Sequence, residues 1–203
     1  MTNRRHTLGL AAAMALAAAA PGAFAQNEPL KIGVILPMTG QAASTGKQIE
    51  AAIKLWMQQT GGKVGNRKVE VLLKDDAGVA DTTRRLAQEL VVNDKVVALA
   101  GFGLTPLALA TAPIATQSKT PLVVMAAATS MITEASPYIV RTSFTLAQSS
   151  TIIADWAAKN GIKKVATLTS DYAPGNDALT FFKQNFTAGG GEVVEEVKVP
   201  LAN

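Results

Sequence analysis

Two threonines lie at positions where a chain of alternating strands and helices could bind an anion. Thr105 follows Gly101 and Gly103 and precedes Pro106. Threonine is a favoured helix cap and proline a favoured first helical residue, so this spacing predicts a helix start. The first turn of a helix presents free N–H groups and the positive end of its dipole. Thr105 is therefore a candidate donor to a ligand carboxylate; the alternative is that its hydroxyl only caps the helix.

A second pair of hydroxyl groups follows three small residues. Ala126, Ala127 and Ala128 precede Thr129 and Ser130. The small side chains leave room for a ligand, and each hydroxyl can donate one hydrogen bond. Thr129 is the second candidate for carboxylate binding, again with helix capping as the alternative.

Other acidic and aromatic residues are less specific. Asp75 and Asp76 are adjacent but lack the further oxygen ligands that a metal site needs, so we expect them to hold local backbone. Asp171 is expected to cap the helix that follows it, with a place facing a ligand as the alternative. Trp56 falls on an apolar helix face and is expected in the core. Phe102 either lines the ligand site or packs beneath it.

The residue types that are missing exclude much of enzyme chemistry. The chain has no cysteine, and its single histidine, His6, lies close to the N-terminus. Without residues 1–25 no histidine remains, which excludes histidine-dependent triads, cysteine nucleophiles and zinc held by either residue. A mechanism that uses only carboxylates stays open. We expect a protein that binds a small molecule without catalysis, metal or cofactor.

The first 25 residues are typical of a cleavable secretory signal peptide. Arg4 and Arg5 precede an apolar segment over 8–20, and residues 23–25 form a small-x-small cleavage site. This apolar segment is shorter than the about 20 residues that span a bilayer. Because the leader holds two of the 19 basic residues and none of the 15 acidic ones, the mature part has a net charge of +2. We expect export to a periplasm and no binding to nucleic acid.

Behind the leader, strand and helix patterns alternate regularly. Strands are expected at 30–36, 68–74, 96–100, 121–125, 138–142, 164–169 and 192–199. Helices are expected at 47–59, 79–93, 105–117, 146–160 and 175–187, with one helical turn at 130–135. This order is typical of α/β folds whose parallel sheets are covered by helices on both faces. Ligands of such folds bind at the carboxyl ends of the strands. That rule selects the loops at 37–45, 101–105, 126–130 and 170–175.

The alternation predicts two lobes. Residues 26–142 are expected to form a first α/β lobe and residues 143–203 the start of a second, truncated one. The second run is too short to cover both faces of a sheet, so the second lobe is expected to be incomplete. The crossing at 142–145 would be the hinge between two parallel-sheet sandwiches.

Over residues 28–200 the chain resembles the branched-chain amino acid (Leu/Ile/Val) binding proteins of ABC transporters, which have the periplasmic binding protein type 1 fold. The resemblance is carried by six blocks in the same order, at 30–40, 61–67, 101–115, 126–130, 137–142 and 170–175. It implies two lobes that close on a small ligand and deliver it to a membrane permease. It also implies that Thr105 and Thr129 hold the ligand carboxylate and that a backbone group of Ala127 contacts the ligand.

Two positions depart from the family pattern. Thr45 stands where an aromatic residue often lines the cleft, and Pro174 stands where amino acid binders usually have a tyrosine. Tyr172, in the same second-lobe loop, is a further candidate contact. The resemblance favours a leucine-type amino acid, and the two departures favour an aromatic or aliphatic acid as the alternative.

The same pattern of strands and helices also occurs in nucleotide enzymes and in ligand sensors. The segment from Gly101 to Pro106 resembles a dinucleotide-binding loop, but proline replaces the third glycine. In addition, no acidic residue lies between Asp94 and Glu134, where the ribose contact is expected. A ligand sensor on the same scaffold, coupled to a receptor, would share all the features above.

Overall fold

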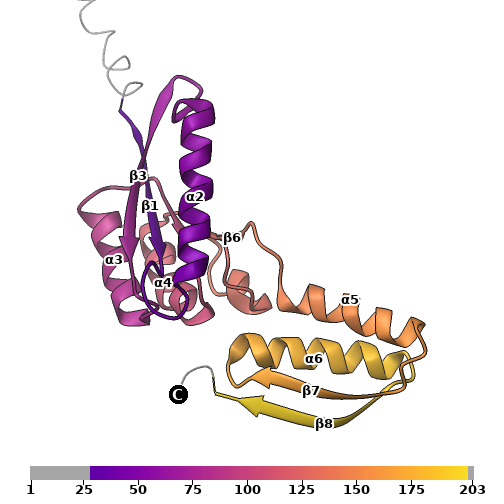
Figure 1. Cartoon of the computed structure of the whole chain (residues 1–203). Coiled ribbons are helices and arrows are strands. Elements are labelled where there is room, and N and C mark those ends of the chain that lie inside the picture. Colours follow the sequence, from indigo (N-terminus) through magenta and orange to yellow (C-terminus); the bar gives the residue numbers. More distant parts are fainter. Residues whose placement is uncertain (1–27, 201–203) are drawn as a thin grey trace, which may run out of the picture.

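The computed structural model describes residues 28–200, which form two α/β units (Figure 1). The predicted signal peptide lies outside the described residues. The first unit contains β1 (Leu30–Leu36), α2 (Ala43–Thr60), β2 (Lys63–Val64), β3 (Arg67–Asp75), α3 (Ala80–Val92), β4 (Ala98–Gly101), α4 (Thr105–Ser118), β5 (Leu122–Val124), the 3₁₀ helix η1 (Ser130–Glu134) and β6 (Ile139–Arg141). The second contains α5 (Leu146–Lys159), β7 (Lys164–Ser170), α6 (Ala173–Ala188) and β8 (Glu192–Val199).

The first sheet has the strand order β2-β3-β1-β4-β5-β6, and all its pairs are parallel except the β2–β3 hairpin. After β1 the chain adds β3 on one side and then moves to β4 on the other. Ligands of open parallel sheets bind at such a reversal, in the crevice beyond the carboxyl ends of the strands. The loops that follow β1, β4 and β5 therefore meet at the edge where a site is expected.

Helices cover both faces of this sheet, as the near-continuous apolar strands predict. On one face, α3 and α4 pack on the larger core cluster through residues such as Leu90 and Ala112. On the other face, Ile49 and Ile53 of α2 pack against Val34 and Leu36 of β1. Figure 1 shows α2 and α3 on opposite sides of the strands. The α/β class predicted from the pattern is confirmed.

The α2 face of the sheet carries an apolar groove of about 410 Å³. Its walls include Ile32, Val69, Met125 and Trp56, and 38% of the surface of Trp56 is exposed. The prediction that Trp56 belongs to the core is wrong for the described residues. Among these residues α2 is the only helix that packs on this face, so nothing closes over the indole ring.

In the second unit, β7 and β8 form a parallel pair, and α5 packs along α6. Phe186 is fully buried among Ala154, Ala157 and neighbouring residues, whereas Leu168 is 69% exposed. The small core follows from the two-stranded sheet, because one parallel pair offers little apolar area to bury.

Both α2 and α6 begin earlier than the periodicity predicts, and a glycine explains each case. Gly46 lies in the first turn of α2, and a Cβ there would overlap with the Pro37 carbonyl. Gly175 lies in the first turn of α6, and a Cβ there would overlap with the Ser170 carbonyl. These glycines allow a helix turn to approach the preceding strand end closely; they do not interrupt the helix.

Candidate functional site

The two candidate threonines meet at the carboxyl edge of the sheet. Thr105 begins α4, directly beyond β4, and Thr129 precedes η1, beyond the neighbouring strand β5. Their hydroxyl oxygens are 2.8 Å apart and hydrogen-bonded, although the residues are 24 positions apart. Both residues are buried, with exposures of 1% and 3%. The parallel pairing of β4 and β5 thus brings together two hydroxyls that the sequence keeps separate.

Neither hydroxyl caps a helix, so the capping alternative is wrong for both residues. The cap position of α4 is Leu104, and that of η1 is Thr129, and neither makes a side-chain cap hydrogen bond. Within the pair one hydroxyl donates to the other, and each hydroxyl has a single hydrogen. One hydrogen of the pair therefore remains available for an acceptor such as a ligand carboxylate.

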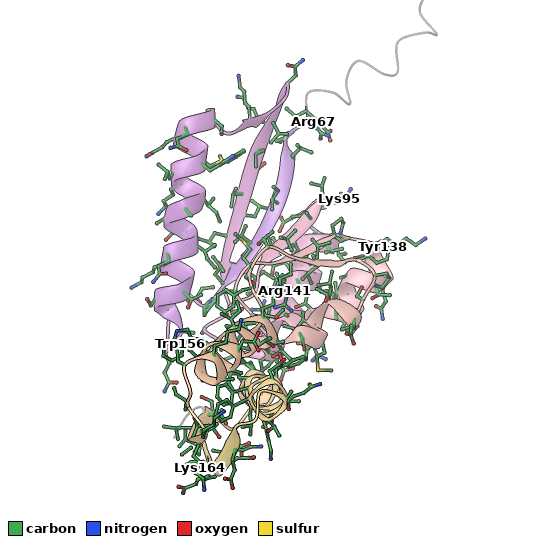
Figure 2. The ribbon with its side chains drawn as sticks, turned by 90° about the vertical axis from the view of Figure 1, so that its right-hand side faces the viewer. Arg67, Lys95, Tyr138, Arg141, Trp156 and Lys164 are labelled. Atoms are coloured by element: carbon green, nitrogen blue, oxygen red, sulfur yellow. The ribbon has the colours of Figure 1, made fainter. Side chains whose placement is uncertain are left out.

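The loop that carries Thr129 is held by Arg141 at the end of β6. The guanidinium donates to the carbonyl oxygens of Ala127 and Thr129. Burial lowers the pKa of Arg141, while the nearby Asp177 carboxylate opposes that shift. In Figure 2, Arg141 lies where the two units meet, and Lys164 lies at the far end of the second unit. This role cannot be predicted from the sequence, because Arg141 lies in a predicted strand and its two partners are 14 and 12 residues away.

Further hydrogen bonds fix the backbone of the same loop. The Ala127 N–H donates to the Phe102 carbonyl at 2.9 Å, and the Leu146 N–H donates to the Ala128 carbonyl at 2.9 Å. By contrast, the N–H groups of Ala128 and Thr129 meet no acceptor within residues 28–200. Those two N–H groups and the hydroxyl pair are donors that this edge can offer to an anion.

The backbone of Ala127, the predicted ligand contact, already makes two hydrogen bonds. Its N–H donates to the Phe102 carbonyl, and its carbonyl accepts from Arg141. A carbonyl oxygen has two lone pairs, so the Ala127 oxygen can still accept one more hydrogen bond. Contact between Ala127 and a ligand remains a prediction.

Phe102 lies beneath the site. Its side chain has no exposed surface and belongs to the core cluster formed with α3 and α4. Its backbone has φ 65°, an uncommon value for a residue other than glycine. Of the two alternatives, the structure places the ring in the packing below the loop. Phe102 therefore supports the backbone at Gly101–Thr105 from within.

The remaining candidates come from both units. Thr45 is half-buried in the first turn of α2. Tyr172 is the cap residue of α6, and burial raises the pKa of its phenol, which stays protonated at neutral pH. Pro174 is buried in the first turn of α6. Within residues 28–200 no hydrogen bond joins Thr45 or Tyr172 to the threonine pair, so their ligand contacts remain predictions.

Asp75 and Asp76 hold loop backbone, as expected. The Asp75 carboxylate accepts from the Met38 N–H, the Thr39 hydroxyl and the Ala77 N–H, each at 2.8 Å. The buried Asp76 accepts from the Gly78 N–H and the Thr83 hydroxyl. Within residues 28–200 no group of three or more acidic, cysteine or histidine side chains is placed to hold a metal.

The two neighbouring carboxylates change the free energy of unfolding with pH in opposite directions. The hydrogen bond from Ala77, with those from Met38 and Thr39, lowers the pKa of Asp75, whereas desolvation raises the pKa of Asp76. Ionisation of Asp76 therefore lowers the free energy of unfolding as the pH rises from below 3.8 through the pKa of Asp76 in the folded protein. Asp75 contributes stability above pH 3.8 and loses it as the pH falls through its folded pKa.

We expect Asp76→Asn to raise the free energy of unfolding more at pH 7 than at pH 3. The asparagine amide can still accept from Gly78 and donate to the Thr83 oxygen. Asp75→Asn is the matched comparison and should lower stability at pH 7 with little effect at pH 3. Urea unfolding at both pH values measures the effect. The same pH trend in both variants would contradict the assignment.

The capping role expected for Asp171 is wrong. The cap residue of α6 is Tyr172, no side chain caps this helix, and Asp171 is exposed.

A different carboxylate of the second unit is engaged at the site. Asp177, inside α6, accepts from the backbone N–H of Ser130 at 3.0 Å and from its hydroxyl at 2.7 Å. Sequence reasoning missed Asp177 because its partner lies 47 residues away in the other unit.

None of the helices formed by residues 28–200 combines the length and the hydropathy needed to cross a bilayer. A family model described as "Periplasmic binding protein" matches residues 29–203.

Comparison with known proteins gives three close relationships. The chain is 48% identical over 197 residues to Leu/Ile/Val-binding protein homolog 6 of Brucella abortus (strain 2308), covering 96% of this chain and 50% of the relative. A solute-binding protein of an ABC transporter from Rhodopseudomonas palustris BisB5, solved with 3,4-dihydroxybenzoic acid, is 71% identical with a TM-score of 0.84, covering 88% of this chain and 48% of that one. A second R. palustris solute-binding protein, solved with 4-hydroxybenzoate, is 47% identical with a TM-score of 0.82, covering 86% and 48%.

The chain thus spans about half the length of the relatives that it matches. The family match covers most of the chain, and the high sequence identities agree with the structural superposition. The chain belongs to the periplasmic binding protein family.

Proposed function

We propose that the protein to which this chain belongs is the substrate-binding component of an ABC transporter, and that its ligand is a small aromatic carboxylic acid. The observation that carries the proposal is the buried Thr105–Thr129 hydroxyl pair at the carboxyl edge of the sheet. The pair and the adjacent N–H groups supply hydrogen-bond donors for a carboxylate. A hydrogen bond to a charged group contributes about 1.5–3 kcal/mol, enough to orient a small anion.

Two features favour an acid without an α-amino group. An ammonium group needs an acidic partner, and Asp177, the carboxylate beside Thr129 and Ser130, already accepts two hydrogen bonds from Ser130. Pro174 has no side-chain donor or acceptor where amino acid binders usually have a tyrosine. The R. palustris protein that is 71% identical was solved with 3,4-dihydroxybenzoic acid. A protonated Tyr172 phenol, in the second unit, is suited to bind a ring hydroxyl.

The role of the protein follows from its family. Export through the signal peptide at residues 1–25 would place the protein in the periplasm, where it would hand its ligand to a membrane permease. The absence of histidine and cysteine from residues 26–203 supports binding without catalysis. A branched-chain amino acid is the second candidate ligand, because a relative named as a Leu/Ile/Val-binding protein homolog is 48% identical.

Thermal unfolding of the full-length protein with a ligand panel tests the proposal. The panel holds 3,4-dihydroxybenzoate, 4-hydroxybenzoate, benzoate, leucine and the neutral analogue benzamide. We expect the benzoates to raise the melting temperature and benzamide to have little effect, because benzamide lacks the charge. A ligand at 100 times its Kd stabilises by about 2.7 kcal/mol, which is easily detected.

Each outcome of the panel is decisive. A rise with leucine alone would replace the aromatic acid by the second candidate. An equal rise with benzamide and benzoate would show that the carboxylate is not the recognised group. No rise with any carboxylate would refute the proposed function.

A further inference from the structure

One carboxylate connects the two units directly at the candidate site. Asp177 lies in α6 of the second unit, and Ser130 begins η1 of the first. Both carboxylate oxygens are used, one by the Ser130 N–H at 3.0 Å and one by its hydroxyl at 2.7 Å. Both residues are partly buried. A two-point contact of this kind fixes orientation as well as distance.

The contact acts on the residue next to the predicted ligand donor. Ser130 directly follows Thr129, whose hydroxyl pairs with that of Thr105. Arg141 holds the Thr129 carbonyl from the first unit, and its charge interacts favourably with that of Asp177. The Thr129 backbone is therefore held on one side by Arg141 and on the other by Asp177.

The two restraints differ in what they depend on. Arg141 belongs to β6, within the same sheet as the loop that it holds, so its hydrogen bonds do not require the second unit. The bonds from Asp177 exist only while α6 lies against η1. Separation of the two units would break both bonds and release the Ser130 end of the loop.

We propose that Asp177 is a positioning residue that couples closure of the two units to the orientation of the Thr129 donors. The inference rests on the proposed binding function. It predicts that Asp177 slows ligand release, because the ligand leaves only after the units separate and the loop is freed. It also predicts that the contact favours the closed arrangement before ligand binds.

Ligand kinetics of the full-length protein test the first consequence, with 3,4-dihydroxybenzoate as the probe. We expect Asp177→Ala and Ser130→Ala each to raise koff about tenfold, as the loss of hydrogen bonds to a charged group predicts, while kon changes by less than about threefold. Asp177→Asn should have an intermediate effect, since its amide oxygen can still accept from the Ser130 N–H. The double variant should be no worse than Asp177→Ala.

Asp155→Asn is the matched control, because Asp155 is an exposed carboxylate in α5 of the same unit without a side-chain hydrogen bond in the described residues. It should leave koff unchanged. An effect of Asp155→Asn as large as that of Asp177→Ala would point to general electrostatics and would overturn the inference. So would a change confined to kon.

A second measurement needs no ligand. Because these 203 residues contain no cysteine, dyes can be placed at Lys54→Cys and Lys164→Cys, whose lysine side chains are 68% and 71% exposed in α2 and β7. In the ligand-free protein, Asp177→Ala should shift the energy-transfer distribution to longer distances, and Asp155→Asn should not. Identical distributions for wild type and Asp177→Ala would refute the closing role. A protein that binds no carboxylate but shows the shift would refute the proposed function and leave the role of Asp177 standing.

Discussion

Thr105→Val and Thr129→Val are each expected to weaken binding of 3,4-dihydroxybenzoate by about tenfold or more, because a hydrogen bond to a charged group contributes about 1.5–3 kcal/mol. The two hydroxyls form one hydrogen-bonded pair, and only one of their two hydrogens is left for the ligand. Valine at either position breaks the pair and leaves its partner without the contact. Calorimetric titration of the full-length variants measures the loss.

The shared hydrogen bond makes a sharper prediction for the double variant. Because the two hydroxyls act as a unit, Thr105→Val/Thr129→Val should bind only slightly worse than the weaker single variant. Thr111→Val is the matched control, since Thr111 is a fully buried threonine of the same helix whose hydroxyl donates to the Leu107 carbonyl. Its affinity should stay within about twofold of wild type. Full affinity in both single variants would return the pair to a purely structural role.

The second large effect is expected from Gly101→Ala. Gly101 has φ 115°, and an added Cβ would overlap with the Ile35 carbonyl of the neighbouring strand. That carbonyl also accepts from the Phe102 N–H at 2.9 Å, so it cannot move aside without losing a hydrogen bond. Overpacking and backbone strain together predict a cost of about 3 kcal/mol or more. Urea unfolding of the full-length protein should show this loss in the free energy of unfolding.

Gly65→Ala separates strain from overlap. Gly65 also has a positive φ, 57°, but nothing lies within 4 Å of the position that a Cβ would take. This control should cost about 1 kcal/mol, the usual penalty for a non-glycine residue in this region. Equal losses in the two variants would mean that the close approach to Ile35 has no energetic weight.

The order of the elements could be predicted from the sequence, because apolar periodicity and turn residues are local properties. β1 and β8 match the expected bounds, and α4 differs by one residue at its end. The start of α2 could not be predicted in this way. Its first turn carries small and polar residues without apolar spacing, and its position depends on the contact between Gly46 and Pro37.

At the candidate site, the sequence could indicate Thr105 and Thr129 as candidates but could not predict that their hydroxyls pair with each other. Local rules predict caps for Thr105 and Thr129, whereas the sheet places each hydroxyl next to the other. The roles of Arg141 and Asp177 could not be predicted, since each depends on a loop that only the tertiary structure brings near. The charges of Arg141 and Asp177 and their positions in β6 and α6 do not predict which residues they contact.

The close approaches at Gly46 and Gly175 have a consequence for how ligand preference can evolve. In each unit the glycine allows the first helical turn to pack closely against the end of the preceding strand. The residue just before the glycine, Thr45 or Pro174, lies in that turn. The backbone at both positions is thus set by the glycine and not by its neighbour. Mutation can exchange the side chain at position 45 or 174 while the backbone of the first helical turn stays in place. If Thr45 and Pro174 contact the ligand as predicted, substitution at either position would change the surface offered to the ligand without moving the backbone of the turn.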